Sequence, residues 1–290
     1  MIRAALIAFL AAILFAPAHA QQSVLDADSI YPEAAQFIGN ALYVAELPTD
    51  RVLVYEKGKK RVFFYQDGCG PASVRPYRNG LAIFCHIRGE LVFVDKNGLV
   101  TGQAGRGVLR DPNDGAPDGS GGLYLSDPGL FSKDTRATGE IYHLTVDGAL
   151  QVVAKDDLWY PNGIYVEGNQ LYLSETFRRK VWRYTIAANG ALTGKTLYLD
   201  IDKIAPRSAY NYREAGPDGL ARAPNGELVV AIYGEGRLLR IDRDGKFVGQ
   251  IDVPFQYVDN VAFGKPGAVV LGAYDNINPP MRGEVRWWKP

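Results

Sequence analysis

The stretch "YPNGIYV" (160–166) continues into "GNQLYLSE" (168–175), and this pair of runs decides the fold. Each run is rich in β-branched and aromatic residues, and a Gly-containing turn separates the two. Such a pattern is typical of two antiparallel strands joined by a tight hairpin. Near-copies of the same unit recur along the whole chain, so the architecture is set by a repeat and not by one motif.

Six units can be aligned by their opening turns, which read "YPEAAQF" (from Tyr31), "GPASVRP" (Gly70), "DPNDGAP" (Asp111), "YPNGIYV" (Tyr160), "GPDGLAR" (Gly216) and "VDNVAFG" (Val258). The residues aligned after the turn are Glu33, Ala72, Asn113, Asn162, Asp218 and Asn260, separated by 39, 41, 49, 56 and 42 residues. A four-stranded propeller blade takes about 40–50 residues. We therefore predict an all-β fold, a six-bladed β-propeller.

The sixth unit reaches the end of the sequence with only three expected strands. Its missing fourth strand can come from "QSVLDAD" (22–28), which precedes the first unit. Pairing the two ends of the chain in this way closes the ring and removes exposed sheet edges. The repeat thus predicts one propeller domain over residues 21–290, with no linker inside it.

The first twenty residues carry a lone Arg3, an apolar run and small residues ending in Ala20. This layout predicts a secretory signal peptide over 1–20, so we expect the mature protein in the periplasm or secreted. The alternative is an N-terminal membrane anchor, for which the apolar run is short, since a bilayer span needs about 20 residues.

Charge is balanced, with 32 basic and 32 acidic residues and no basic run. This balance argues against nucleic acid or a membrane surface as partner. We expect a small-molecule substrate and a monomer or weak dimer.

Two cysteines, Cys69 and Cys85, flank a predicted hairpin of 72–77 and 81–86 and fall at its open end. In an oxidising compartment they can form a disulfide. Two buried free thiols are the alternative.

The residues aligned after the turns are the candidate metal ligands. The first strand of every propeller blade lines the central channel, so equivalent positions form a ring, and five of the six carry Glu, Asp or Asn. Converging oxygens of this kind need a partner. Hard oxygen ligands favour one divalent cation, calcium first, with magnesium, manganese or zinc as alternatives. Ordinary turn chemistry explains any one position, but it gives no reason for a blade-periodic oxygen.

The second strands should end at the mouth where the first strands begin. Their final residues are then expected to surround a pocket: Glu46, His86, Asp127, Glu175, Tyr233 and Tyr274. Among them His86 is a candidate proton carrier or substrate donor. The long segment 200–216 is either a lid over this mouth or a surface excursion.

Several blocks resemble the SMP-30/gluconolactonase/luciferin-regenerating-enzyme family over essentially the whole mature chain. "YPEAAQF" with "ALYVAE" is similar to the family's "EGP-x-W" with "LYF-x-D". "DPNDGAPDGSGGLYLSDPG" and "YPNGIYV" with "QLYLSET" resemble its "PND" and "PNG" blocks. "GPDGLARAPNGELVVAIYGEGRLLRID" and "VDNVAFG" are similar to its "PDG" block and its closing "TN-x-AFGG" motif.

The resemblance implies a divalent-metal-dependent lactonase, most often acting on sugar-acid lactones. It places Glu33, Asn162 and Asp218 as metal ligands, with Asn113 touching metal or substrate. Some members carry an Arg two residues before the position of Asn113 to hold substrate. Here Asp111 occupies that place and Arg110 lies one residue earlier. We thus expect the substrate to contact Asn113, Arg110, His86, Glu175 and Tyr233.

Lactone opening needs a polarised carbonyl and an activated water. The resemblance implies Asp218 as the catalytic residue that activates the water. A carboxylate beside a divalent cation has a lowered pKa, so Asp218 suits orienting the water better than storing its proton. Two other functions stay open: an arylesterase or organophosphate hydrolase on the same site, and a non-catalytic ligand-binding propeller.

Overall fold

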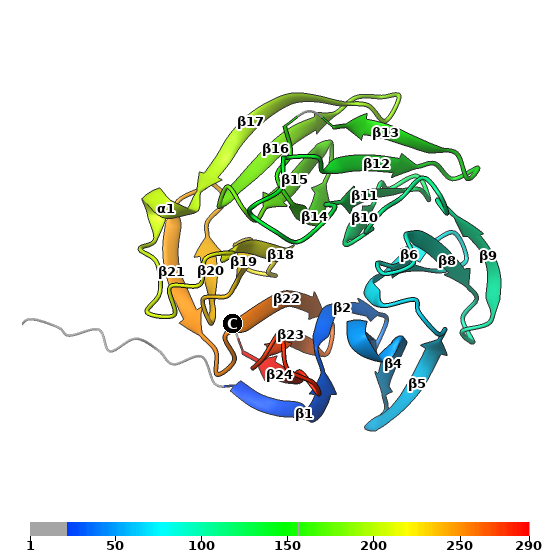
Figure 1. Cartoon of the computed structure of the whole chain (residues 1–290), viewed down its shortest axis with the longest axis horizontal. Coiled ribbons are helices and arrows are strands. Elements are labelled where there is room, and N and C mark those ends of the chain that lie inside the picture. The colour runs from blue at the N-terminus through cyan, green and yellow to red at the C-terminus, as the bar shows by residue number, and fades with distance from the viewer. Residues whose placement is uncertain (1–21, 156, 290) are drawn as a thin grey trace, which may run out of the picture.

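In the computed structural model, residues 22–155 and 157–289 are described, and they form six four-stranded sheets arranged around a central channel (Figure 1). Blade one contains β2 (Pro32–Ile38), β3 (Ala41–Glu46), β4 (Arg51–Glu56) and β5 (Lys59–Tyr65). Blade two contains β6 (Pro71–Tyr77), β7 (Gly80–Cys85), β8 (Glu90–Val94) and β9 (Val100–Ala104). Blade three contains β10 (Gly115–Pro117), β11 (Leu123–Asp127), β12 (Glu140–Leu144) and β13 (Leu150–Ala154). The predicted six-bladed propeller is confirmed. The predicted signal peptide, 1–20, lies outside the described residues.

The other three blades follow the same antiparallel order. Blade four contains β14 (Pro161–Glu167), β15 (Gln170–Glu175), β16 (Lys180–Ile186) and β17 (Leu192–Asp200). Blade five contains β18 (Gly216–Arg222), β19 (Leu228–Tyr233), β20 (Arg237–Ile241) and β21 (Phe247–Asp252). Blade six contains β22 (Tyr257–Gly264), β23 (Gly267–Ala273), β24 (Arg282–Trp288) and β1 (Gln22–Ile30). Short helices occur at η1 (Leu47–Thr49) and α1 (Ile201–Ile204). Neither of these two helices of the described chain has the length and apolar character needed to cross a bilayer.

Strand β1 completes the last blade, as predicted. It pairs antiparallel with β24, from Gln22 opposite Trp288 to Ile30 opposite Arg282. The first described strand is therefore the outermost strand of the last blade, and it joins segments from opposite ends of the described chain in one sheet.

The core lies between the blades. Six apolar clusters each join one blade to the next, such as the cluster that packs Val52 and Phe63 of blade one against Val74 and Ile83 of blade two. Because each sheet alternates its side chains, it buries one face against each neighbouring blade. The channel is left to the polar ends of the innermost strands.

In five of the six blades a bulge lies near the start of the innermost strand. The register between the first two strands slips after the first or second paired residue, which is Pro in blades one, two, four and five and Val258 in blade six. Proline lacks a backbone N–H and is tolerated at a strand's first position. A bulge then turns the next side chain out of the pleat.

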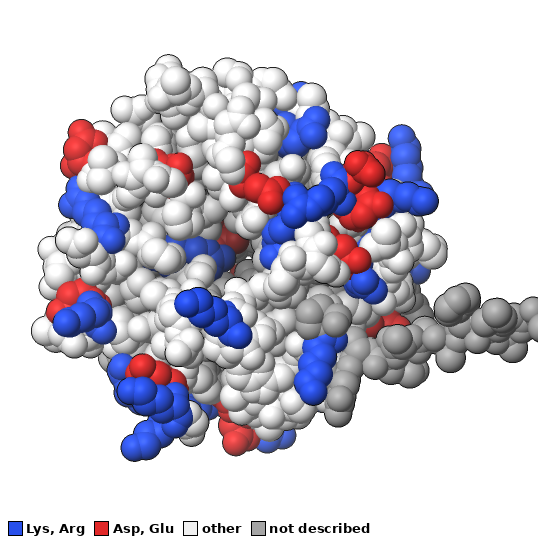
Figure 2. All heavy atoms as spheres, turned by 180° about the vertical axis from the view of Figure 1, so that it is seen from behind, with Lys and Arg blue, Asp and Glu red and all other residues white. Residues whose placement is uncertain are grey.

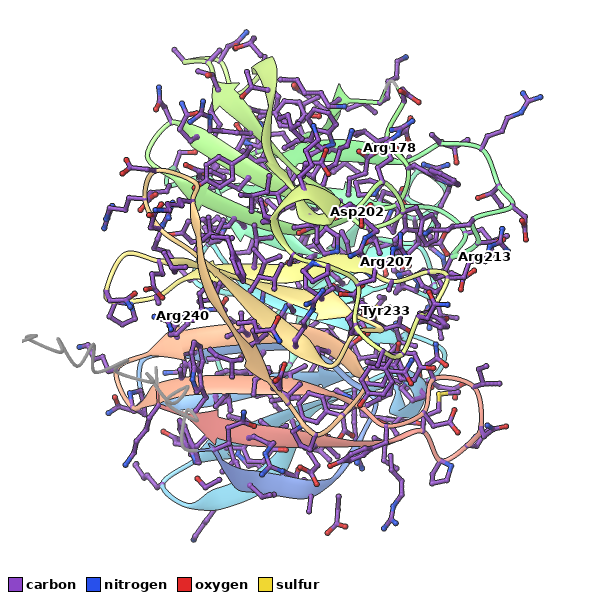
Figure 3. All side chains as sticks on the ribbon, turned by 90° about the vertical axis from the view of Figure 1, so that its left-hand side faces the viewer. Arg178, Asp202, Arg207, Arg213, Tyr233 and Arg240 are labelled. Carbon is purple, nitrogen blue, oxygen red and sulfur yellow. A yellow bond between two sulfur atoms is a disulfide. The ribbon has the colours of Figure 1, made fainter. Side chains whose placement is uncertain are left out.

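The two ends of the channel differ. Figure 2 shows the face opposite to that of Figure 1, where a hollow opens at the centre among interspersed basic and acidic side chains. A cavity at the far end of the innermost strands is lined by residues that include Arg75 and Arg222. In the side view of Figure 3, Tyr233 and Arg213 lie on one side of the propeller and Arg240 lies on the other.

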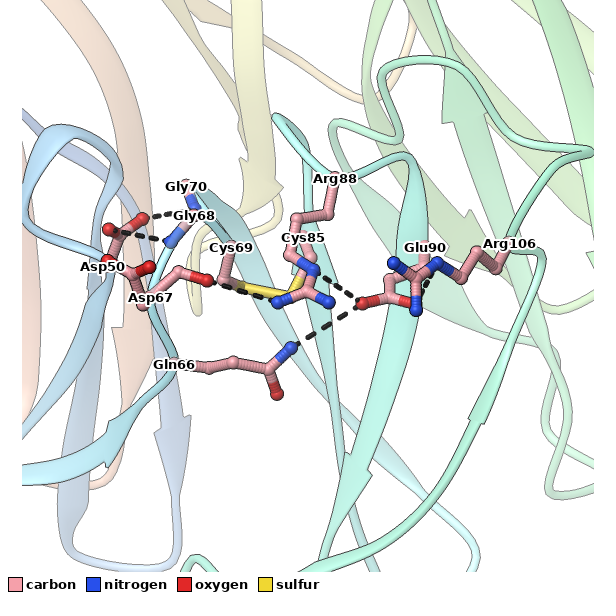
Figure 4. The surroundings of a disulfide bond; sticks show 10 residues. All are labelled: Asp50, Gln66, Asp67, Gly68, Cys69, Gly70, Cys85, Arg88, Glu90 and Arg106. Carbon is pink, nitrogen blue, oxygen red and sulfur yellow. Dashed lines mark hydrogen bonds and ion pairs between the residues drawn. A yellow bond between two sulfur atoms is a disulfide. The ribbon is translucent and has the colours of Figure 1, made fainter.

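The two cysteines form a disulfide, which settles the alternatives in favour of the bond (Figure 4). Cys69 precedes β6 and Cys85 ends β7, so the bond ties the entry of blade two to its own hairpin. Around it, Asp50 accepts hydrogen bonds from the backbone N–H groups of Gly68 and Gly70, at 3.0 and 2.8 Å. The segment that enters blade two is thus held by covalent and polar contacts together.

Candidate active site

The bulge residues form the predicted ring at one mouth of the channel. Glu33, Asn113, Asn162 and Asp218 are all buried and all line one cavity of about 230 Å³. The ring members that the repeat predicted therefore converge, although they come from four blades. The four side chains supply carboxylate and amide oxygens to a single space.

The structure corrects the sixth member of the ring. Val258 pairs with Gly272 and Asn260 with Leu271, so the bulged residue between them is Asp259. Asn260 lies in the ladder and lines the cavity at the opposite end. The turn "VDNV" lacks the Pro and Gly that mark the other turns. The sequence alone therefore could not decide whether Asp259 or Asn260 is the ring residue of this blade.

Hydrogen bonds fix the orientation of Asn162. Its Nδ2 donates to Thr176 Oγ1 at 3.3 Å, and Thr176 Oγ1 in turn donates to the carbonyl of Pro217 at 2.9 Å. The amide oxygen is left buried and without a hydrogen-bond partner in the described chain. Because buried polar atoms are nearly always paired, this oxygen is presented to something that binds in the channel.

Asp259 shows the same property more strongly. Both of its carboxylate oxygens are buried and lack a partner among the described residues. The neighbouring carboxyl of Glu33 accepts a long hydrogen bond from Asn113 Nδ2, at 3.5 Å. The ring thus holds three carboxyl groups, Glu33, Asp218 and Asp259, with few donors among them.

The shortage of positive charge shows in the pKa values. Burial, and then the repulsion of Glu33, raise the pKa of Asp218 and of Asp259 well above the usual range. Burial likewise raises the pKa of Glu33 to about 7. A divalent cation would relieve both causes, since it solvates the carboxylates and cancels their repulsion.

The donor set therefore fits a hard cation. Among the described residues, no three His, Cys, Asp or Glu side chains converge closely enough to hold an ion by themselves. The amide oxygen of Asn162 is thus needed to complete the set with Glu33 and Asp218. Carboxylate and amide oxygens are the ligands that calcium and magnesium prefer.

The cation-free protein is expected to lose stability as the pH rises. A folded pKa raised to about 7 for Glu33, against 4.5 for the free group, means that the folded state binds more protons between these values. The stabilisation is complete below pH 4.5 and is lost as the pH passes 7. Thermal unfolding in chelator should show a lower Tm at pH 8 than at pH 6. Added calcium should raise the Tm more at pH 8 than at pH 5, and an equal shift at both pH values would contradict the assignment.

Two further predicted residues line the same cavity. His86 follows β7 and Tyr233 ends β19, and both face the ring members. His86 is half-buried, its Nδ1 atom is buried without a partner among the described residues, and burial lowers its pKa. The lowered pKa favours the neutral imidazole, which can donate a hydrogen bond from one nitrogen only.

Glu175 does not line the cavity, and its predicted contact with substrate is wrong. It is fully buried behind the mouth, where its carboxylate accepts hydrogen bonds from the backbone N–H of Trp159 at 2.7 Å and from Trp182 Nε1 at 2.5 Å. The same carboxylate also forms an ion pair with Arg178. Its role is to hold the segment that enters blade four.

The same role explains Glu46 and Asp127, which were also expected at the rim. Glu46 accepts from the N–H of Ile30 at 3.0 Å, and Asp127 accepts from the N–H groups of Arg110 and Asp111, at 2.9 and 2.8 Å. Each carboxylate at the end of a second strand thus caps the segment that leads into its own blade. Tyr274 is half-exposed and lies outside the cavity lining.

Arg110, expected to bind substrate, also lies outside the lining of this cavity. Its Nη2 donates to the carbonyl of Thr138 at 2.6 Å, and its guanidinium lies near Asp127 and Glu140. The side chain is exposed on the outer loop because its backbone N–H, held by Asp127, turns it away from the channel.

Comparisons with known proteins show the family and the fold of the chain. A family model described as the SMP-30/gluconolactonase/LRE-like region matches residues 32–271. A lactonase, drp35, from Staphylococcus saprophyticus is 24% identical over 235 residues, which cover 76% of this chain and 65% of the relative. The alignments with the first three curated relatives span between 43% and 65% of their lengths.

Two solved structures show the same fold. A calcium-binding protein, regucalcin, from Agrobacterium tumefaciens superposes with a TM-score of 0.75 at 21% identity, covering 92% of this chain and 93% of the other. A gluconolactonase from Xanthomonas campestris superposes with a TM-score of 0.73 at 21% identity, covering 93% and 89%.

Proposed function

The chain belongs to the SMP-30/gluconolactonase/LRE-like family, and on this premise we propose that it is a hydrolase that opens lactones with one divalent cation at the ring. The observation that carries the proposal is the buried amide oxygen of Asn162, which has no partner among the described residues and belongs to the lining of the cavity that Glu33 and Asp218 share. Relatives named lactonase and gluconolactonase, and a structural neighbour described as calcium-binding, support it.

Glu33, Asn162 and Asp218 would hold the cation, with Asn113 beside them and Asp259 adding charge next to Glu33. Calcium suits these hard ligands best, with magnesium, manganese or zinc as alternatives. Bound there, the cation would supply Lewis-acid polarisation of the lactone carbonyl, an effect worth several kcal/mol.

The chain's own residues would handle the water and the leaving group. Asp218 is buried and lines the cavity together with Asn162, so its carboxylate is placed to orient the attacking water and take its proton. His86 lies across the same cavity as a neutral donor. It is placed to donate a hydrogen bond to the ring oxygen, and the proton that Asp218 takes from the water would pass to the alkoxide that leaves when the ring opens.

We also propose that the protein acts in the periplasm or outside the cell. The disulfide between Cys69 and Cys85 supports this location, because such bonds persist in oxidising compartments. The predicted signal peptide agrees with it.

An activity assay with and without each divalent cation tests the proposed function. Protein stripped with chelator should open lactones at least about a hundredfold more slowly than protein resupplied with calcium, magnesium, manganese or zinc, if the ion polarises the carbonyl. Acid release in a pH-stat would measure lactones, aryl esters and organophosphates side by side. Turnover of aryl esters or organophosphates alone would reassign the substrate. Cation binding without any turnover would leave a ligand-binding propeller.

A further inference from the structure

The wall of the cavity above the ring is almost entirely apolar or aromatic. It consists of Tyr31, Leu47, Phe131, Tyr160, Tyr233 and Met281. Apart from the ring members, the polar residues among the described lining are His86 and Asn276. No lysine or arginine is present in that described lining, and Arg110 donates a hydrogen bond to the carbonyl of Thr138 instead.

The hydroxyl groups of two of the three wall tyrosines, Tyr31 and Tyr233, form hydrogen bonds with protein partners. The Oη atoms of Tyr31 and Tyr233 lie 3.1 Å apart and share a hydrogen bond. Asn276 Nδ2 donates to Tyr233 Oη at 2.8 Å and to Tyr212 Oη, behind the wall, at 3.1 Å. Since these hydroxyls satisfy one another, the wall offers a substrate mainly carbon surface.

Phe131 closes this wall from one side. It belongs to the loop 128–139 between β11 and β12, and its ring packs at 4.8 Å from Tyr160 and 5.6 Å from Tyr233. The loop is fastened to the segment 205–215 by the ion pair of Arg213 with Asp134, at 2.5 Å. Figure 3 shows Arg213 on the same side of the propeller as Tyr233. The phenyl ring is therefore held over the cavity by contacts outside it.

Two of the wall tyrosines stand in a strained backbone conformation. Tyr31 and Tyr160 directly precede the prolines of their turns and have φ of 39° and 60°. At the matching place in blade two, Gly70 has φ of 51°, and glycine is the residue that adopts this region without strain. A tyrosine kept where glycine fits better indicates that its ring has a function, here as part of the wall.

A polyhydroxylated substrate would lose hydrogen bonds in this cavity. Each sugar hydroxyl that leaves water without a new partner carries a desolvation cost, whereas alkyl or aryl groups gain by burial against aromatic rings. We propose that the site selects lactones whose ring carries alkyl or aryl groups, in contrast to the sugar-acid lactones expected from the family resemblance. This inference rests on the lactone hydrolysis proposed above.

Paired substrates test the inference. The cation-loaded protein should show a kcat/KM at least about tenfold higher for an alkyl- or aryl-substituted δ-lactone than for a fully hydroxylated one, as a pocket matched to carbon surface allows. Phe131→Ser should lower kcat/KM for the apolar lactone roughly tenfold and leave the hydroxylated lactone nearly unchanged. Leu130→Ser is the matched control, because Leu130 is 70% exposed and lies outside the lining.

The corresponding lactams test the wall without turnover. Calorimetry should detect tighter binding of the apolar lactam than of the hydroxylated one, and Phe131→Ser should remove that difference. A preference for the hydroxylated ligands in both experiments would overturn the inference while lactone hydrolysis stands. Binding of the apolar lactam without opening of either lactone would keep the selectivity and refute the reaction.

Discussion

Asp218→Asn should lower kcat by about a thousandfold while cation binding stays measurable. General-base contributions of this size follow from removing the group that takes the proton of the attacking water. The asparagine keeps one oxygen in the same place, and Glu33 and Asn162 remain, so the ligand set loses charge but not its geometry. The measurement is kcat on the best lactone, with a calorimetric calcium titration of the same sample.

A matched control is Asp244→Asn, which removes a carboxylate from the exposed turn between β20 and β21 of the same blade. It should leave both kcat and cation affinity unchanged. Full activity in Asp218→Asn would rule out the catalytic assignment. Loss of cation binding in proportion to activity would make Asp218 a ligand only.

Arg75→Met should lower the free energy of unfolding by about 3–5 kcal/mol, because it leaves a buried charge without its partner. Arg75 is 7% exposed on β6, and its Nη2 atom lies 2.5 Å from Asp114 Oδ1. Its Nε also donates to the carbonyl of Gly115 at 2.6 Å, so one side chain joins blades two and three across the channel.

Urea unfolding in chelator measures this effect. The double variant Arg75→Met/Asp114→Asn should regain part of the lost stability, since it removes the orphaned charge as well. Arg240→Met is the control: Arg240 forms a two-point pair with Glu227 that is partly exposed and should contribute no more than about 1 kcal/mol. A loss as small as that of the control would show that the Asp114 charge finds another partner.

The pair of Arg75 and Asp114 also matters to the ring. The charge of Asp114 adds to the causes that raise the pKa of Glu33 and Asp218. The guanidinium of Arg75 lies beside Asp114 and offsets part of this negative charge. The sequence offered no sign of it, because Arg75 stands in a strand pattern like any other polar residue.

Much of the fold was readable because it repeats. The turn Tyr160–Gly163 and its copies predict one hairpin in each blade. The remaining segment "QSVLDAD" is predicted as the strand that closes the ring, and β1 occupies that place. Glu33, Asn162 and Asp218 could be grouped because equivalent positions of a closed ring face the same axis. The slip between Asp259 and Asn260 shows the limit, since a bulge shifts the inward residue by one where no Pro or Gly marks it.

The amino-acid sequence by itself determined the blade count, the closure and the oxygen ring, since each depends on a local pattern that recurs with a fixed period. Only the tertiary structure decided which other residues reach that ring. Glu175 and Arg110 are bound from outside the cavity by backbone groups of their own blades. Phe131 lies over the mouth on a loop that an ion pair joins to the segment 205–215. The sequence could not predict this position, because ion pairs and ring packing between distant segments do not recur with a fixed period.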